Sequence, residues 1–243
     1  MELCDFDRVF ALAARNKGGA AALEALLAKT RPSVPEEIAA IADDRILSEM
    51  TRRVFQAGFS WKVVDAKWPA FEELFAGFDP RYCAALSEER FDALLKDSRI
   101  VRNAAKIRSI TANAGFVLDL AAEHGSAARL LSDWPDSDYV GLLELLDKRA
   151  SRVSGQAGMR FLRSIGKPSF ITTGAVTAAL IREGVLTKPP SGRRDLKTIQ
   201  DAFNQWSAQS GRDLTAISRT LAMSVDEGEA GQPKAAYLTR SLR

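Results

Sequence analysis

The sequence predicts an all-α protein built as a helical bundle. Apolar residues recur every three or four positions through most of the chain, the spacing that places them on one face of an α-helix. The clearest case is formed by Ile46, Met50, Val54 and Ala57. No stretch shows the strict alternation of apolar and polar residues that indicates a half-buried strand. With 243 residues, of which 46% are hydrophobic, the chain can form a sizeable core in one or two domains.

The elements before residue 44 are short. Two helices are predicted over residues 5–15 and 18–29, separated by a link that contains Gly18. A loop follows, and residues 34–42 form a further turn or two of helix, with Pro35 in its first turn.

The helix that begins at Asp44 is the clearest element of the chain. Asp43 or Asp44 is expected to cap its start, and Gly58 follows its last periodic residue, where a left-handed C-terminal conformation is easiest for glycine. A helix over 62–75 follows, and Ser87 has the position of an N-cap for the next one.

The remaining helices follow the same apolar spacing. They are predicted over residues 103–123, 138–150, 156–165, 172–183, 195–209 and 213–223. We divide the chain into an N-terminal helical extension (1–43), a helical core (44–187), C-terminal helices packing on that core (188–225), and a tail (226–243) rich in small and polar residues that is expected to be mobile.

Composition excludes several classes of protein. No run approaches the roughly 20 apolar residues of a membrane-spanning helix, and acidic residues precede the short apolar run at the N-terminus, unlike a secretory signal. The two cysteines, Cys4 and Cys83, are too few for a disulfide framework, so we expect a reducing, cytoplasmic setting.

Basic residues are clustered although the net charge is only +3. The stretches 99–108 and 160–167 both contain several basic residues and no acid. Local patches of this kind matter more for nucleic-acid binding than the total charge. A solvated helix face is the alternative interpretation of each.

The run VFQAGFSWKVVDAKWPAFEELFAGFDP resembles the core of the DNA-3-methyladenine glycosylase I family, which has a Q-A-G-L-S-W segment followed by a helix and an F-D-P turn. The similarity covers roughly residues 44–120, and a weaker similarity extends over residues 160–187. The matching residues are Gln56, Ala57, Gly58, Ser60, Trp61, Phe78, Asp79 and Pro80.

This resemblance implies an α-helical DNA glycosylase of the helix-hairpin-helix superfamily that acts in base excision repair. Such an enzyme flips an alkylated base such as 3-methyladenine out of the duplex and hydrolyses its N-glycosidic bond. It implies that Trp61 stacks on the flipped base, because an aromatic face recovers part of the lost base stacking. A core tryptophan after a helix is the alternative. The residues expected to line the base pocket are Trp61, Gln56, Phe59, Arg53 and Glu49.

Arg53 departs from the family, which has a glutamate at this position in contact with the methylated base. An arginine cannot accept a hydrogen bond and repels a cationic base. Glu49 is one turn away and spaced to pair with Arg53. The pair is either a structural ion pair or the polar floor of an altered pocket.

The segment 160–184 is the best candidate for holding DNA. A hairpin between two helices can place backbone N–H groups and the positive end of the second helix against a phosphate. Its turn lacks the glycines that allow the backbone to approach a phosphate closely, so ordinary packing of two helices is the alternative. The predicted DNA-binding residues are Lys167, Ser169, Thr172, Thr173, Arg163, Arg102 and Lys106.

We expect no cofactor and no metal. The family builds a zinc site from cysteines and histidines, but here Cys4 has no matching partners and His124 is the only histidine. No carboxylate is marked as a general base, so the catalytic residue is unknown. The expected partner is double-stranded DNA with a damaged base, with no membrane, and the expected state is a monomer. The alternative function is a catalytically altered or inactive DNA-binding protein that keeps the fold.

Overall fold

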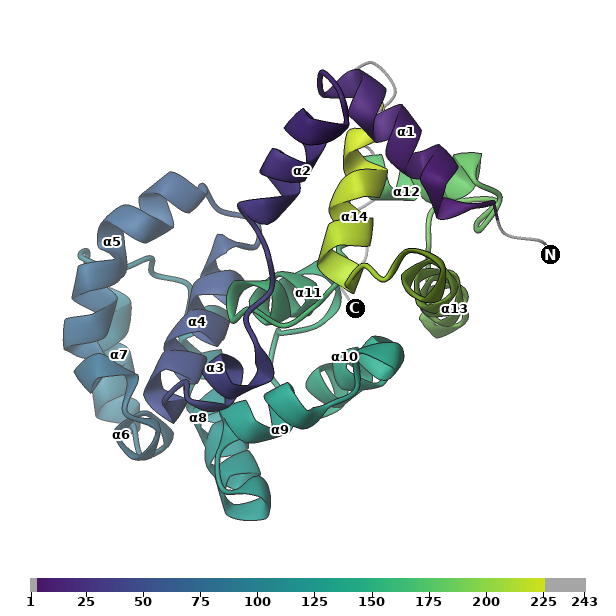
Figure 1. Cartoon of the computed structure of the whole chain (residues 1–243). Helices are drawn as coiled ribbons and strands as arrows, with labels where there is room; N and C mark the ends of the chain where they lie inside the picture. Colours follow the sequence, from purple (N-terminus) through teal and green to yellow (C-terminus); the bar gives the residue numbers. More distant parts are fainter. Residues whose placement is uncertain (1–3, 226–243) are drawn as a thin grey trace. The chain divides into compact units, whose positions relative to one another are not determined.

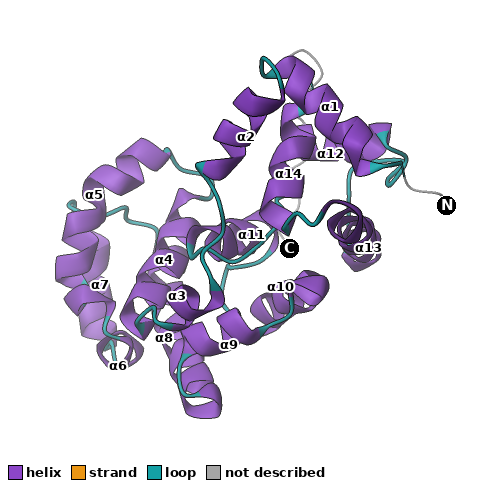
Figure 2. Ribbon diagram, in the orientation of Figure 1, coloured by secondary structure: helices purple, strands orange, loops and turns teal. Residues whose placement is uncertain are grey.

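The computed structural model describes residues 4–225. Every regular element within that range is a helix, and none is a strand (Figure 2). The predicted all-α class is therefore confirmed. The expected mobile tail, 226–243, lies outside the described residues.

The described chain divides into two compact units. One is Ser33–Lys167, and the other combines the described residues up to Pro32 with those from Pro168 onward. This division differs from the four segments expected from the sequence, whose boundaries stay a prediction.

The unit Ser33–Lys167 is organised around α4, the predicted central helix, which packs against α5, α8, α9 and α11 (Figure 1). Its helices in chain order are α3 (Pro35–Ala39), α4 (Asp43–Gln56), α5 (Trp61–Leu74), the short η1 (Ala76–Phe78), α6 (Pro80–Ala84), α7 (Glu88–Lys96), α8 (Ala104–His124), α9 (Ala127–Asp133), the short η2 (Asp136–Asp138), α10 (Tyr139–Arg149) and α11 (Gly155–Ser164).

The start of α4 differs from the expected cap. Ala42 occupies the N-cap position, and no side chain caps the helix. Asp43 instead accepts a hydrogen bond at its Oδ1 atom from the backbone N–H of Ala127, 2.9 Å away, at the start of α9. A carboxylate at the N-terminus of a helix is stabilised by the free N–H groups there. Asp43 therefore connects α4 to α9, a helix that is too short to be predicted from apolar spacing.

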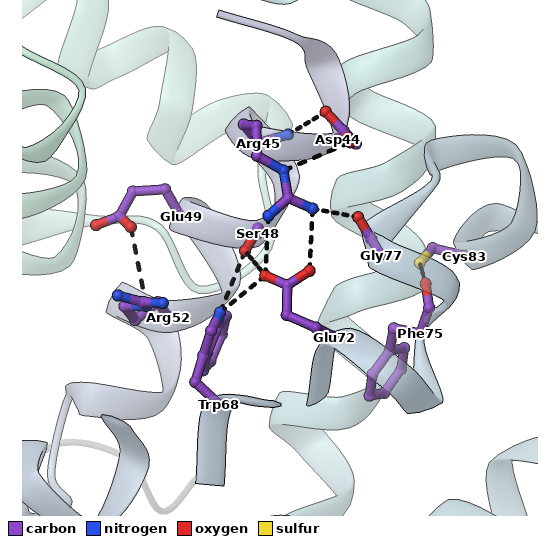
Figure 3. A network of polar contacts seen from close by, with 10 residues as sticks. All are labelled: Asp44, Arg45, Ser48, Glu49, Arg52, Trp68, Glu72, Phe75, Gly77 and Cys83. Atoms are coloured by element: carbon purple, nitrogen blue, oxygen red, sulfur yellow. Dashed lines mark hydrogen bonds and ion pairs between the residues drawn. The ribbon is translucent and has the colours of Figure 1, made fainter. Parts of the chain in front are cut away.

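A polar network joins α4 to α5 (Figure 3). The carboxylate of Glu72 accepts two hydrogen bonds of 3.0 Å from Arg45 and one of 2.8 Å from Ser48. The indole N–H of Trp68 donates to the same carboxylate over 3.1 Å. Burial opposes ionisation of Glu72, but the bonds from Arg45 and Ser48 outweigh it, and the pKa of Glu72 is lowered. The network fixes α5 against α4.

Stacked aromatic rings fill the space beside this network. Phe78 lies parallel to Trp68, with ring centroids 5.4 Å apart, and to Phe75, 5.6 Å apart. Three consecutive residues have a left-handed backbone: Ala76 (φ 50°), Gly77 (φ 66°) and Phe78 (φ 62°). This conformation is unfavourable for residues with a side chain. The two stacking contacts and the hydrogen bond from Arg45 to the carbonyl of Gly77 hold it in place.

The second unit comprises α1 (Phe6–Asn16), α2 (Ala20–Ala28), α12 (Gly174–Arg182), α13 (Arg193–Ser210) and α14 (Leu214–Met223). Helix α14 packs against the other four. The indole N–H of the buried Trp206 donates to the carbonyl of Cys4 over 3.0 Å. Within the described residues, no helix of either unit combines the length and apolarity needed to cross a membrane.

Candidate functional site: exposed aromatic residues among arginines

Two exposed aromatic side chains follow the end of α4. The helix ends at Gln56, and Gly58 has the left-handed conformation (φ 80) that the sequence predicts. This turn leads into α5, which begins at Trp61. The exposed fraction is 41% for Phe59 and 44% for Trp61. Large aromatic residues are usually buried in a core, so a pair of them at the surface is a candidate binding feature.

Arg53 lies beside Trp61 and is held in place from two sides. Its guanidinium forms the predicted ion pair with Glu49, one turn earlier on α4. It also donates to the Oε1 atom of Gln56 over 2.7 Å, and the amide nitrogen of Gln56 donates to Asp65 over 3.1 Å. The Cζ atom of Arg53 is 5.6 Å from the centroid of the Trp61 ring. The structure therefore brings together four of the five predicted pocket residues.

Arg160, on α11, is a second arginine at the same ring. Its Cζ atom is 5.2 Å from the centroid of Trp61. Burial lowers the pKa of Arg160, and the positive charge of Arg53 lowers it further. Two guanidinium groups thus lie close enough to repel each other, with a half-exposed indole ring beside both.

Phe59, the fifth predicted pocket residue, lies against Lys106 of α8. The ammonium nitrogen of Lys106 is 4.6 Å from the centroid of the Phe59 ring. The same nitrogen donates to the carbonyl oxygens of Val54 (2.8 Å), Phe55 (3.3 Å) and Ala57. The last carbonyls of a helix have no partner within the helix. Lys106 is therefore a buried C-terminal cap for α4. The sequence predicts a DNA contact at Lys106, but its ammonium group is already bonded to these carbonyls and is not left for a phosphate.

The pKa of Lys106 provides a test of this arrangement. Burial, together with the positive charge of the exposed Arg152, lowers the pKa of Lys106 to about 8. Replacing Arg152 with glutamine removes a like charge, so we expect the pKa of Lys106 to rise in that variant. The measurement is an NMR titration of the lysine ε-CH₂ signals, assigned with a Lys106→Met sample. An unchanged pKa would contradict the coupling to Arg152.

The other predicted DNA-binding residues of this unit differ in their accessibility. Arg102 is exposed and Arg163 is half-buried. Lys167 is buried, and its ammonium group donates to the carbonyls of Ser132 (3.0 Å) and Trp134 (2.5 Å) and pairs with Asp136 at 3.1 Å. Its burial leaves Lys167 unavailable for the expected phosphate contact.

The predicted DNA-binding residues of the second unit lie at the start of α12. Thr173 caps this helix, because its hydroxyl accepts a hydrogen bond of 3.2 Å from the N–H of Val176. Ser169 is buried, and its N–H donates to the hydroxyl of Thr215 over 3.0 Å. This N–H is not free for a phosphate. Helices α11 and α12 both form as expected, and a helix-hairpin-helix element made from them stays a prediction.

Sequence reasoning missed the roles of Arg160, Asp65 and Arg152 around the two aromatic rings. The available signal was the basic stretch at 160–167, but nothing in the sequence places it near residue 61. In residues 4–225, no group of three or more histidine, cysteine, aspartate or glutamate side chains is arranged to hold a metal ion.

Comparison with known proteins gives a consistent result for the region that contains these aromatic residues. The family model for methyladenine glycosylase matches residues 38–150. The DNA-3-methyladenine glycosylase of Haemophilus influenzae is 37% identical over 117 residues, which are 44% of this chain and 63% of that protein. DNA-3-methyladenine glycosylase 1 of Escherichia coli K12 is 38% identical over 65 residues, 27% of this chain and 35% of that protein. The chain thus spans less than two thirds of each relative.

A solved structure of 3-methyladenine DNA glycosylase I from Staphylococcus aureus is 20% identical, covers 51% of this chain and 77% of its own, and has a TM-score of 0.46. Trp61, Arg53 and Lys106 fall within the matched residues, whereas Arg152 and Arg160 follow them. Over residues 38–150 the chain is similar to the methyladenine glycosylase family.

Proposed function

We propose that this protein is a DNA glycosylase of base excision repair, a hydrolase that removes a damaged base from double-stranded DNA. The observation that carries the proposal is the half-exposed Trp61 within the matched region, next to Arg53 and Arg160. An enzyme that acts on a base in duplex DNA must take it out of the stack, and an aromatic ring then provides a new stacking surface. The relatives are named for 3-methyladenine, which makes alkylated bases the first substrates to test.

The charge around the site supports DNA as the partner. Arg102 and Arg152 are exposed in the same unit as Trp61, and exposed arginines can neutralise phosphates and orient the duplex. In the second unit, Thr172 and Thr173 at the start of α12 are further proposed contacts, since the N-terminus of a helix attracts anions. This proposal places the protein inside the cell, where DNA is found.

Replacing Trp61 with alanine tests the stacking role. Stacking of a base on an aromatic ring contributes roughly 1–3 kcal/mol, so we expect the excision rate to fall by roughly 10- to 100-fold. Stability should change little, because Trp61 is half-exposed. The measurement is release of bases from alkylated duplex DNA, with each base identified by mass spectrometry.

Tyr82→Ala is the matched control. Tyr82 is an aromatic residue of α6 that is 39% exposed, and α6 follows the far end of α5. This variant should excise like the parent. Equal excision by the Trp61→Ala variant would rule out the stacking role. If the parent protein released no base from alkylated, deaminated or oxidised duplex DNA while binding it in a salt-sensitive way, the protein would be a DNA-binding relative without glycosylase activity.

A further inference from the structure

The groups around Trp61 are rich in positive charge and in hydrogen-bond donors. The positive charge of Arg53 is matched by Glu49. Arg160 has no carboxylate within ion-pair distance among the described residues, and its hydrogen bond, of 3.4 Å, goes to the neutral Gln156. Arg160 therefore leaves an uncompensated positive charge at 5.2 Å from the indole centroid.

The amide of Gln56 is already hydrogen-bonded to its neighbours, and the buried Oε1 atom of Glu49 is in the ion pair with Arg53 but has no hydrogen bond among the described residues. Both ends of the Gln56 amide are engaged, the oxygen with Arg53 and the nitrogen with Asp65. A guanidinium group has five N–H donors and no acceptor. The Nε atom of Arg53 is buried and has no hydrogen-bond partner among the described residues. That Nε atom is shielded from a ligand as well as from solvent, so the donors that a ligand can reach are the N–H groups of the part-exposed Arg160.

These features disfavour a cationic base. A positive charge on a flipped base that stacks on Trp61 would lie near the unpaired guanidinium group of Arg160. At the effective dielectric constant of a partly buried site, this repulsion weakens binding by roughly 100-fold. An electrically neutral base that bears a carbonyl oxygen has no such penalty, and its oxygen can accept from the N–H groups of Arg160.

Resting on the proposed glycosylase function, we propose that this site selects neutral damaged bases with a carbonyl oxygen, and that Arg53 and Arg160 stabilise the leaving base. Selection of this kind follows from the donors and charges at Trp61. It sets this protein apart from the relatives named for 3-methyladenine.

The chemistry of bond cleavage gives the two arginines a role. Water adds to C1′ of the sugar, and the electron pair of the N-glycosidic bond moves to the base nitrogen. A cationic base leaves as a neutral molecule, but a neutral base leaves with a negative charge, mostly on its ring nitrogen and carbonyl oxygen. Two fixed guanidinium groups beside the ring stabilise that charge where it develops. The base then takes a proton from solvent, and the attacking water loses one to solvent, so the reaction is a hydrolysis.

The first experiment compares two sets of lesions under single-turnover conditions with the full-length protein. The neutral set is duplex DNA with one hypoxanthine, uracil or 8-oxoguanine, and the cationic set is duplex DNA with 3-methyladenine or 7-methylguanine. We expect at least one neutral base to be excised roughly 10-fold faster than either cationic base. Faster excision of a cationic base would overturn this inference and leave the proposed function standing. Release of no base from either set would overturn both.

Variants then test the two arginines separately. Arg160→Gln removes the unpaired charge without breaking an ion pair, so folding should be unaffected. We expect it to slow excision of the neutral base by roughly 100-fold and to leave excision of a cationic base equal or faster. Arg53→Glu introduces a negatively charged acceptor and should reverse the order of preference, with circular dichroism as the check on folding. Arg81→Gln, which removes one exposed charge from α6, is the control. Equal slowing of both lesion sets by Arg160→Gln would overturn the inference.

Discussion

Replacing Phe71 with alanine is expected to lower the free energy of unfolding by about 4 kcal/mol, the usual loss when a buried phenylalanine is truncated. Phe71 is fully buried in α5. Its ring centroid is 4.7 Å from that of Phe55 on α4 and 5.0 Å from that of Trp68. Removing the ring opens a cavity between α4 and α5 and takes away both contacts, each worth about 1 kcal/mol beyond the buried area.

The measurement for Phe71→Ala is urea unfolding followed by tryptophan fluorescence, because three of the four tryptophans lie in the same unit. Phe71→Leu fills much of the volume and should lose less than half as much stability, which gives a result even if the alanine variant does not fold. Tyr82→Ala, at an exposed position, should stay within about 0.5 kcal/mol of the parent. A loss below about 1.5 kcal/mol for Phe71→Ala would show that this cluster does not hold α4 and α5 together.

The long helices were predictable because their signal is local and repeated. The apolar stripe of α4 runs over nearly four turns, and the glycine at 58 marks its end, so both its extent and its C-terminal turn are confirmed. The helix α9 was missed because seven residues are too few to show a period. Its N-terminus is also stabilised by Asp43, a residue far away in the sequence.

The candidate site shows the same difference between local features, which the sequence predicts, and contacts between residues far apart in the chain, which it does not. The ion pair between Glu49 and Arg53 follows from a spacing of four residues on one helix, and it is confirmed. The approach of Arg160 to Trp61 depends on the packing of α11 against α4, which no local pattern encodes. The sequence predicts a DNA contact at Lys106 for the same reason: a basic residue within a basic stretch gives no sign that carbonyls about 50 residues earlier in the chain bind it in the interior.

Lys106→Met is the second substitution with a large expected effect. Methionine keeps the length of the side chain but has no N–H group, so the carbonyls of Val54, Phe55 and Ala57 lose their donor. Leaving buried acceptors unsatisfied costs about 1 kcal/mol or more for each group, and we expect a total loss of about 3 kcal/mol in the free energy of unfolding. The effect should persist from pH 7 to pH 9, across the pKa of about 8, because a neutral amine still donates two hydrogen bonds.

The pH dependence of the parent protein follows from the same lysine. The pKa of Lys106 is lowered in the folded state, so between about pH 8 and its unfolded value the unfolded chain binds more protons than the folded one. Stability from this group therefore increases as the pH rises through that range. The Lys106→Met variant should lack this increase, which distinguishes the lysine from other groups that titrate in alkaline solution.

The loss of the cap should also affect the candidate site at Phe59 and Trp61. Lys106 connects α8 to the end of α4 and contacts the ring of Phe59. Without the ammonium group, residues 57–60 lose their anchor, and Trp61 follows them directly. We expect Lys106→Met to increase acrylamide quenching of tryptophan fluorescence and to slow base excision, whereas Lys96→Met, at an exposed position on α7, should change neither. If Lys106→Met weakened DNA binding but left stability unchanged, the lysine would be a phosphate contact after all, and its role as a cap for α4 would be wrong.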